Sequence, residues 1–195
     1  MNRKNIEFKA KVESLETYEE KLKTLNPLFV GLDHQVDTYF NVPNGRLKLR
    51  EGNIENALIN YNRAKPADAK LSDIILYQHK PDAALKQILQ LQLGVKAVVD
   101  KQRKIYFINN VKFHFDQVQG LGTFLEVEVI DEKGNLSIDE MKKDCDHYFQ
   151  FFGLSQNQLV DRSYSDLILI WKCGNLKIWK WTTINKYKLF FYCSN

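Results

Sequence analysis

Several short segments of this chain alternate apolar with charged residues, which is the pattern of β-strands that bury one face. Residues 6–12 read Ile-Glu-Phe-Lys-Ala-Lys-Val, and residues 46–50 alternate in the same way as Arg-Leu-Lys-Leu-Arg. Further strands are predicted at residues 38–42, 57–63, 74–78, 97–101, 104–109, 111–118 and 123–130. The pattern therefore predicts a sheet of about eight mostly antiparallel strands.

Three helices are predicted between or after these strands. Ser14 is a suitable N-cap for a helix that ends before Pro27, and a second helix runs from Pro81 to Leu93. Ser137 and Glu140 have the spacing of a capping box, which opens a third helix that ends at Gly153. Together these elements predict one α+β domain with the helices outside the sheet.

The net positive charge of the chain comes from its C-terminal end. Residues 167–195 contain five Lys and no acidic residue, so residues 1–166 hold 23 of the 28 Lys and Arg residues against all 24 acids. A near-neutral body argues against a general nucleic-acid surface. We expect the main domain to cover residues 1–168, followed by a Lys- and aromatic-rich extension at 169–195. This extension is interpreted as an extra strand pair, a poorly packed appendage or an extension foreign to the fold.

The composition predicts that the protein is cytoplasmic. Three Cys residues at irregular spacing do not suggest a disulfide framework and fit a reducing compartment. The apolar runs are too short to span a bilayer, and the N-terminus leads into no long apolar stretch that would suggest a secretory signal. We therefore expect no membrane partner and no nucleic-acid partner. A homodimer is left open.

The second face of the strands carries clustered charges instead of mixed polar residues. One strand with such a face would suggest solvated ion pairs, but five strands point to an enclosed charged interior. In a closed barrel these charges would face inward, where an unpaired charge costs several kcal/mol. The residues of this face are Asn5, Glu7, Lys9, Lys11, Arg46, Lys48, Arg50, Arg63, Lys101, Arg103, Lys112, His114, Asp116, Glu126 and Glu128.

Such an interior becomes favourable when a polyanion and a metal ion enter it. Lys and Arg donors suit phosphoryl oxygens. The carboxylates of Glu7, Glu126 and Glu128 are hard oxygen ligands that suit Mg²⁺ or Mn²⁺. A triphosphate requires both features at once, so we expect a triphosphate substrate with Mg²⁺ or Mn²⁺ as cofactor.

The motifs resemble those of the CYTH superfamily of triphosphate tunnel metalloenzymes. Residues 5–9, Asn-Ile-Glu-Phe-Lys, resemble its Glu-x-Glu-x-Lys signature, and residues 34–40 resemble its class IV adenylyl cyclase branch. The segments 47–50, 101–103, 120–128 and 163–167 follow in the same order and spacing, so the resemblance covers about residues 2–168. It implies a closed antiparallel eight-stranded β-barrel, or tunnel, that binds a triphosphate.

The resemblance also implies roles for individual residues. The metal would be held by Glu7, Glu126 and Glu128, with Asn5 in the place of the first signature Glu. Phosphates would be held by Lys9, Lys48, Arg50, Arg63, Lys101 and Arg103. The candidate catalytic residues are Lys11, Lys101 and Arg103, and both Lys11 and a metal-bound water remain open as the base. Asn5 removes one negative charge from the metal site, so metal affinity is expected to be lower.

Three functions are compatible with these features. The first is a metal-dependent enzyme, which would be either an adenylyl cyclase that forms cyclic AMP and pyrophosphate from ATP or a hydrolase of thiamine triphosphate, nucleoside triphosphates or tripolyphosphate. Both reactions rely on positioning and charge neutralisation. The second is an inactive phosphoanion-binding module, which Asn5 suggests. The third, nucleic-acid binding through the C-terminal Lys and Trp residues, has the least support.

Overall fold

The structure, a computed structural model, describes residues 2–63 and 70–183. Within these residues the strands form one closed antiparallel barrel in the order β1-β5-β4-β3-β2-β6-β7-β8. The strands are β1 (Asn2–Lys11), β2 (Leu28–Phe40), β3 (Arg46–Gly52), β4 (Ala57–Arg63), β5 (Lys70–Gln78), β6 (Val95–Ile108), β7 (Val111–Val118) and β8 (Gly122–Asp131). The α+β class and the closed eight-stranded barrel predicted from the sequence are confirmed.

Two strands are much longer than the sequence pattern predicted. β2 begins at Leu28 instead of Thr38, and β6 joins the two strands expected at 97–101 and 104–109 into one. These two strands pair with each other over nearly their whole length, from Leu28 opposite Phe107 to Phe40 opposite Val95. This pairing satisfies the backbone hydrogen bonds of both segments. It explains why they form strands although their side chains do not follow a strand pattern.

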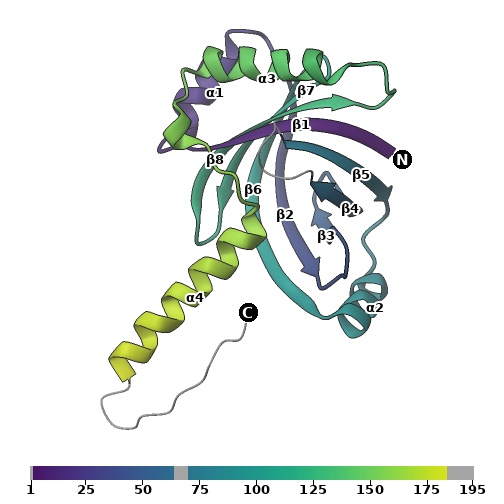
Figure 1. Cartoon of the computed structure of the whole chain (residues 1–195), viewed down its shortest axis with the longest axis vertical. Helices are drawn as coiled ribbons and strands as arrows, with labels where there is room; N and C mark the ends of the chain where they lie inside the picture. The colour runs from purple at the N-terminus through teal and green to yellow at the C-terminus, as the bar shows by residue number, and fades with distance from the viewer. Residues whose placement is uncertain (1, 64–69, 184–195) are drawn as a thin grey trace.

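The described residues also form four α-helices: α1 (Leu15–Lys23), α2 (Ala83–Leu93), α3 (Ile138–Phe152) and α4 (Tyr164–Thr183), with a 3₁₀ turn at Gln156–Gln158. Figure 1 shows α1 and α3 side by side on one side of the barrel. Their apolar faces pack on the outer faces of β1, β7 and β8 around Phe113, Leu125 and Val127, which are fully buried. The predicted caps are present, because Ser14 accepts from the amide of Thr17 and Ser137 forms a capping box with Glu140.

The first turns of α4 fill one end of the barrel. Tyr164 and Ile168 are buried there against Phe124 of β8 and Val99 of β6. From this end α4 extends away from the barrel (Figure 1). The charged side chains lie in the part of the barrel interior that this apolar cluster does not fill.

The strand pair considered for the C-terminal extension is wrong for residues 169–183. These residues continue α4, so the boundary expected at residue 168 falls inside a helix. A helix places its apolar residues at a spacing of three to four, which explains the absence of a period of two in this segment. Residues 184–195 lie outside the described residues.

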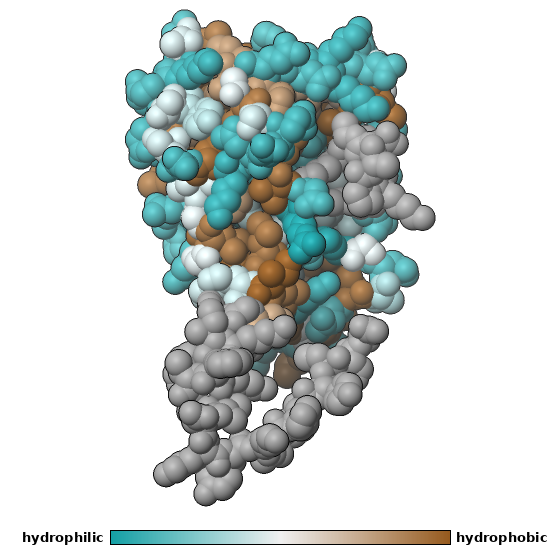
Figure 2. All heavy atoms as spheres, turned by 60° about the vertical axis from the view of Figure 1, so that its left-hand side comes forward, coloured by the Kyte–Doolittle hydropathy of each residue, from teal (hydrophilic) through white to brown (hydrophobic). Residues whose placement is uncertain are grey.

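No helix among the described residues is long and apolar enough to cross a membrane. The face in Figure 2 is mostly hydrophilic, and apolar side chains reach the surface in its lower part. Scattered exposed apolar residues are ordinary for a folded protein.

Candidate functional site

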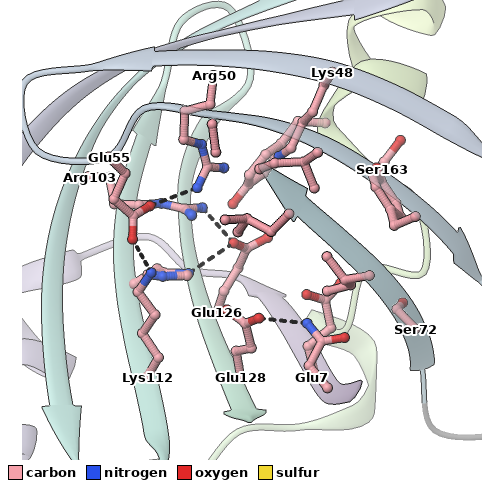
Figure 3. Close-up of a pocket in the computed structure, with 18 of the residues that line it drawn as sticks. Glu7, Lys48, Arg50, Glu55, Ser72, Arg103, Lys112, Glu126, Glu128 and Ser163 are labelled. Atoms are coloured by element: carbon pink, nitrogen blue, oxygen red, sulfur yellow. Dashed lines mark hydrogen bonds and ion pairs between the residues drawn. The ribbon is translucent and has the colours of Figure 1, made fainter. Parts of the chain in front are cut away.

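The barrel encloses a cavity of about 400 Å³ that is lined by the charged faces of the strands. Most residues of the charged face predicted from the sequence reach it. They are Asn5, Glu7, Lys9, Lys48, Arg50, Lys101, Arg103, Lys112, His114, Glu126 and Glu128. Figure 3 shows how these side chains converge from different strands. The cavity is large enough for a small organic ligand.

Asp37 of β2 gathers three of the predicted phosphate-binding cations. Its carboxylate accepts from Lys101 Nζ at 2.8 Å, from Lys48 Nζ at 2.9 Å and from Arg50 Nε at 2.8 Å. Burial raises the pKa of Asp37, but the charges of Arg50 and Lys101 outweigh burial and leave this pKa well below its ordinary value. Asp37 therefore stays ionised and holds the three cations side by side.

Lys101 is a buried cation, and its side chain is 1% exposed. Loss of water lowers the pKa of Lys101 to about 7, although the charge of Asp37 acts in the other direction. Arg103, Arg50 and Lys48 lower this pKa further. Lys101 is thus a cation whose proton is held weakly near neutral pH.

A second cluster surrounds Arg103 of β6. Its guanidinium donates to both carboxylate oxygens of Asp116 and, at 2.6 Å, to Glu126 Oε2. The hydroxyl of Tyr164 donates to Asp116 at 2.8 Å, which connects the cluster to the first turn of α4. Burial lowers the pKa of Arg103, but the charges of Asp116 and Glu126 hold it well above its ordinary value.

Lys9 of β1 connects the metal-ligand candidates to the closed end of the barrel. Its Nζ lies 3.0 Å from Glu126 Oε1 and 3.9 Å from the centre of the Tyr164 ring. Burial raises the pKa of Glu126, but Lys9 and Arg103 hold it well below its ordinary value. Glu126 is therefore bound to two cations of the cavity.

Glu7 and Glu128 lie opposite each other in the pairing of β1 and β8, and both line the cavity. Asn5 Nδ2 donates to Glu128 Oε1 at 2.6 Å. The other atom of this amide, Asn5 Oδ1, is buried without a hydrogen-bond partner in the described part of the structure. A carbonyl oxygen and two carboxylates are the donor set that a hard divalent cation takes, so these residues fit the implied metal. No group of three acidic, His or Cys side chains in metal-binding geometry is found in the described residues.

A family model described as "CYTH domain" matches residues 3–164. The chain belongs to the CYTH domain family. The match covers all eight strands of the barrel and ends at the first residue of α4. The family resemblance predicted from the sequence is confirmed.

Proteins named as adenylate cyclases are similar to this chain over most of its length. The chain is 27% identical to a protein of Methanocaldococcus jannaschii named "Putative adenylate cyclase", over 83% of this chain and 97% of that protein. It is 25% identical to the adenylate cyclase CyaB of Aeromonas hydrophila, over 83% and 87%. A solved structure from Pyrococcus horikoshii superposes with a TM-score of 0.72 at 27% identity, over 84% of this chain and 98% of that one.

One predicted site residue of this CYTH chain, Lys11, does not line the cavity. Lys11 is exposed, since its cross-strand partner Phe124 belongs to the apolar cluster that closes the barrel end. Its Nζ lies 5.9 Å from the centre of the Phe124 ring. The side chain of Arg63 lies outside the described part of the structure.

Sequence reasoning missed Asp37 and Glu55, which both bind cations inside the barrel. His34 and Asp37 both lie within β2, where His34 is exposed and binds Asp100. Residues 33, 35, 37 and 39 are Asp, Gln, Asp and Tyr, and their shared parity was the available signal. Glu55 follows β3 in a loop and has no such signal.

Asn5→Glu is expected to make the fold depend on a divalent cation. The new carboxylate would face Glu128 in place of the 2.6 Å amide contact, which costs about 1–3 kcal/mol of unfolding free energy without metal. Mg²⁺ or Mn²⁺ should restore this loss, with about tenfold higher affinity than for the wild type. Thermal unfolding with and without the ion measures both effects, and neutral Asn5→Gln is the control. Equal stabilisation of all three proteins by the ion would contradict the metal assignment.

Proposed function

We propose that this chain is a metal-dependent enzyme that binds a triphosphate in its barrel and, like class IV adenylyl cyclases, converts ATP to cyclic AMP and pyrophosphate. The observation that supports this most is the arrangement of cations from β1, β3 and β6 around one cavity that also holds Glu7 and Glu128. Cations in a water-poor cavity stabilise the charge of a triphosphate and of a pyrophosphate leaving group. The names of the Methanocaldococcus and Aeromonas relatives support the choice of reaction.

In the proposed reaction the ribose 3′-oxygen forms a bond to the α-phosphorus while the bond from this phosphorus to the pyrophosphate oxygen breaks. The 3′-hydroxyl gives its proton to solvent water, and pyrophosphate leaves with the electron pair of the broken bond. The phosphate chain would be held by Lys9, Lys48, Arg50, Lys101 and Arg103. Of these, Lys101 and Arg103 would also be the catalytic residues. A divalent ion at Glu7, Glu128 and Asn5 would supply charge neutralisation as a Lewis acid. Lys11 is left out of the proposed set because it lies outside the cavity.

A wall of apolar side chains beside these cations gives room for the nucleoside part. Tyr39, Ile59, Tyr61, Ile74 and Leu76 line the same cavity. Aromatic and aliphatic walls are typical of sites for organic ligands. They make no favourable contact with a purely inorganic phosphate chain. This wall supports a nucleotide over tripolyphosphate as the substrate.

The decisive experiment is incubation of the protein with ATP and, separately, with tripolyphosphate in the presence of Mg²⁺ or Mn²⁺. Cyclic AMP and pyrophosphate from ATP would support the cyclase. Orthophosphate release would support a triphosphate hydrolase, the second candidate, because the same cations hold any triphosphate chain regardless of its attachment. Binding without either product would support the inactive phosphoanion-binding module. No binding of either compound would overturn the proposal.

Triphosphate binding is expected to weaken as the pH rises above 7, because it requires the protonated form of Lys101. The unfolded chain keeps this proton to about pH 10, whereas the folded chain loses it near pH 7, so the destabilisation that buried Lys101 causes in the unliganded fold decreases as the pH rises from 7 to 10. The affinity for the triphosphate, in contrast, decreases as the pH rises. Calorimetric titration between pH 7 and 9 should show up to about a tenfold loss of affinity per pH unit relative to Lys101→Met. Parallel pH profiles of the two proteins would contradict this role.

A further inference from the structure

Glu55 places a carboxylate inside the cationic cavity, although it belongs to the loop between β3 and β4 and not to a strand. Its Oε2 accepts from Arg50 Nη1 at 2.8 Å, and its Oε1 accepts from Lys112 Nζ. Figure 3 shows the carboxylate between these two cations, which come from β3 and β7. A protein side chain thus occupies the position of an anion in a cavity built for anions.

The backbone of this loop is fixed by a buried acid of β2. Asp33 is fully buried and accepts from the amides of Ile54 at 2.9 Å and Glu55 at 3.0 Å. Gly52 allows this approach, since a Cβ at this position would lie 2.7 Å from Asp33 Oδ1. The loop therefore presents Glu55 to the cavity in a defined place.

The side chain of Glu55 is more open than those of the other acids that bind the cavity cations. It is 27% exposed, whereas Glu126 is 11% exposed and Asp37 and Asp116 are at most 1% exposed. Asp37, Asp116 and Glu126 are also fixed on strands, so movement would disturb the barrel itself. Of these four acids, Glu55 can leave its cations at the lowest cost, because its carboxylate can rotate toward water while the backbone stays in place.

We propose that Glu55 occupies a phosphate position, and that the substrate displaces its carboxylate from Arg50 and Lys112. This inference rests on the proposed function, and it adds Lys112 to the phosphate-binding residues. A phosphoryl group offers the same oxygen acceptors with more negative charge, so Arg50 and Lys112 bind it in place of the carboxylate. In the absence of substrate, Glu55 neutralises two buried cations that would otherwise destabilise the fold. Glu55 is therefore a built-in competitor that also protects the unliganded cavity.

Glu55→Gln separates this competition from a structural role. Tripolyphosphate, in the presence of a chelator that removes divalent ions, is titrated into the wild type and the variant by calorimetry. We expect about tenfold tighter binding by the variant, together with a lower melting temperature without ligand and a larger increase on adding tripolyphosphate. Glu51→Gln is the matched control, because Glu51 lies on the same hairpin and binds Lys86 at 2.6 Å outside the cavity. It should bind tripolyphosphate like the wild type.

Lys112→Met tests the other half of the inference. Loss of this cation should weaken tripolyphosphate binding at least fivefold in the Glu55→Gln background, where no carboxylate competes for it. A Lys112→Met variant that binds as tightly as its parent would remove Lys112 from the phosphate-binding set and overturn the inference.

The outcomes distinguish this inference from the proposed function. If the wild type binds tripolyphosphate and Glu55→Gln binds it equally or more weakly, the competitor role is wrong and the proposed function stands. If neither protein binds tripolyphosphate or ATP, both are wrong. If only the variant binds, the competitor role is supported in its strongest form.

Discussion

Arg103→Met is expected to lower kcat/KM for the triphosphate substrate by at least about a thousandfold. The guanidinium of Arg103 is buried and lines the cavity, where it donates to Asp116 and Glu126, and Lys9 and Lys101 line the same cavity. Removing it leaves two buried carboxylates that repel the substrate and removes a donor for phosphoryl oxygens. Steady-state kinetics, with folding verified by circular dichroism, measures the loss.

Two further variants distinguish this effect from general damage. Arg103→Lys keeps the charge but loses the paired donors that bind a carboxylate or phosphate in a fork, so an intermediate loss is expected. Lys104→Met removes the next residue along β6, whose Nζ binds Glu19 at 2.6 Å outside the cavity and is 38% exposed. This control should keep wild-type kinetics. A folded Arg103→Met protein that retains more than a tenth of the activity would contradict the role of Arg103.

Asp37→Asn is expected to lower the free energy of unfolding by about 3–5 kcal/mol, because it leaves Lys48, Arg50 and Lys101 close together without their counter-ion. For a chain of this length the melting temperature should fall by about 10 °C. Tripolyphosphate should restore a large part of this loss, since it supplies the missing negative charge. Chemical and thermal unfolding with and without tripolyphosphate measure both effects.

The control for Asp37 is Asp100→Asn, which removes an exposed partner of His34 and should change stability by less than about 1 kcal/mol. The wild type should also lose stability in acid. The folded-state pKa of Asp37 lies well below its unfolded value, so its contribution is present above pH 4 and is lost as the pH falls toward the folded-state value. Asp37→Asn should lack this part of the acid transition. Equal acid sensitivity of both proteins would show that Asp37 does not carry it.

The period of two predicted which side chains share a face, and together with the closed barrel that the family resemblance implies it predicted most of the cavity. Lys9, Lys48, Arg50, Lys101 and Arg103 all reach the cavity as their parity required. Lys11 has the same parity as Lys9 but lies outside, because parity does not say where the interior ends. That limit depends on packing between Phe124 and Tyr164, which are 40 residues apart in the chain.

The acids that hold the cations in place were harder to predict. Asp37 lies in a strand whose first half alternates poorly and is held by its pairing with β6, a contact between distant segments. Glu55 reaches the cavity only through a loop conformation that Asp33 fixes from another strand. Such interactions depend on the three-dimensional arrangement of the backbone. The parity of residues 33, 35, 37 and 39 indicates a shared face for Asp37, but no local pattern predicts the position of Glu55.

Because the apolar cluster that contains Tyr164, Ile168 and Phe124 fills one end of the barrel, we expect the cavity to open to solvent only at its other end. A long polyphosphate could insert one end but could not thread through, so chain length beyond the charged part should add no affinity. Substrate and products must also exchange through the same mouth, one after the other.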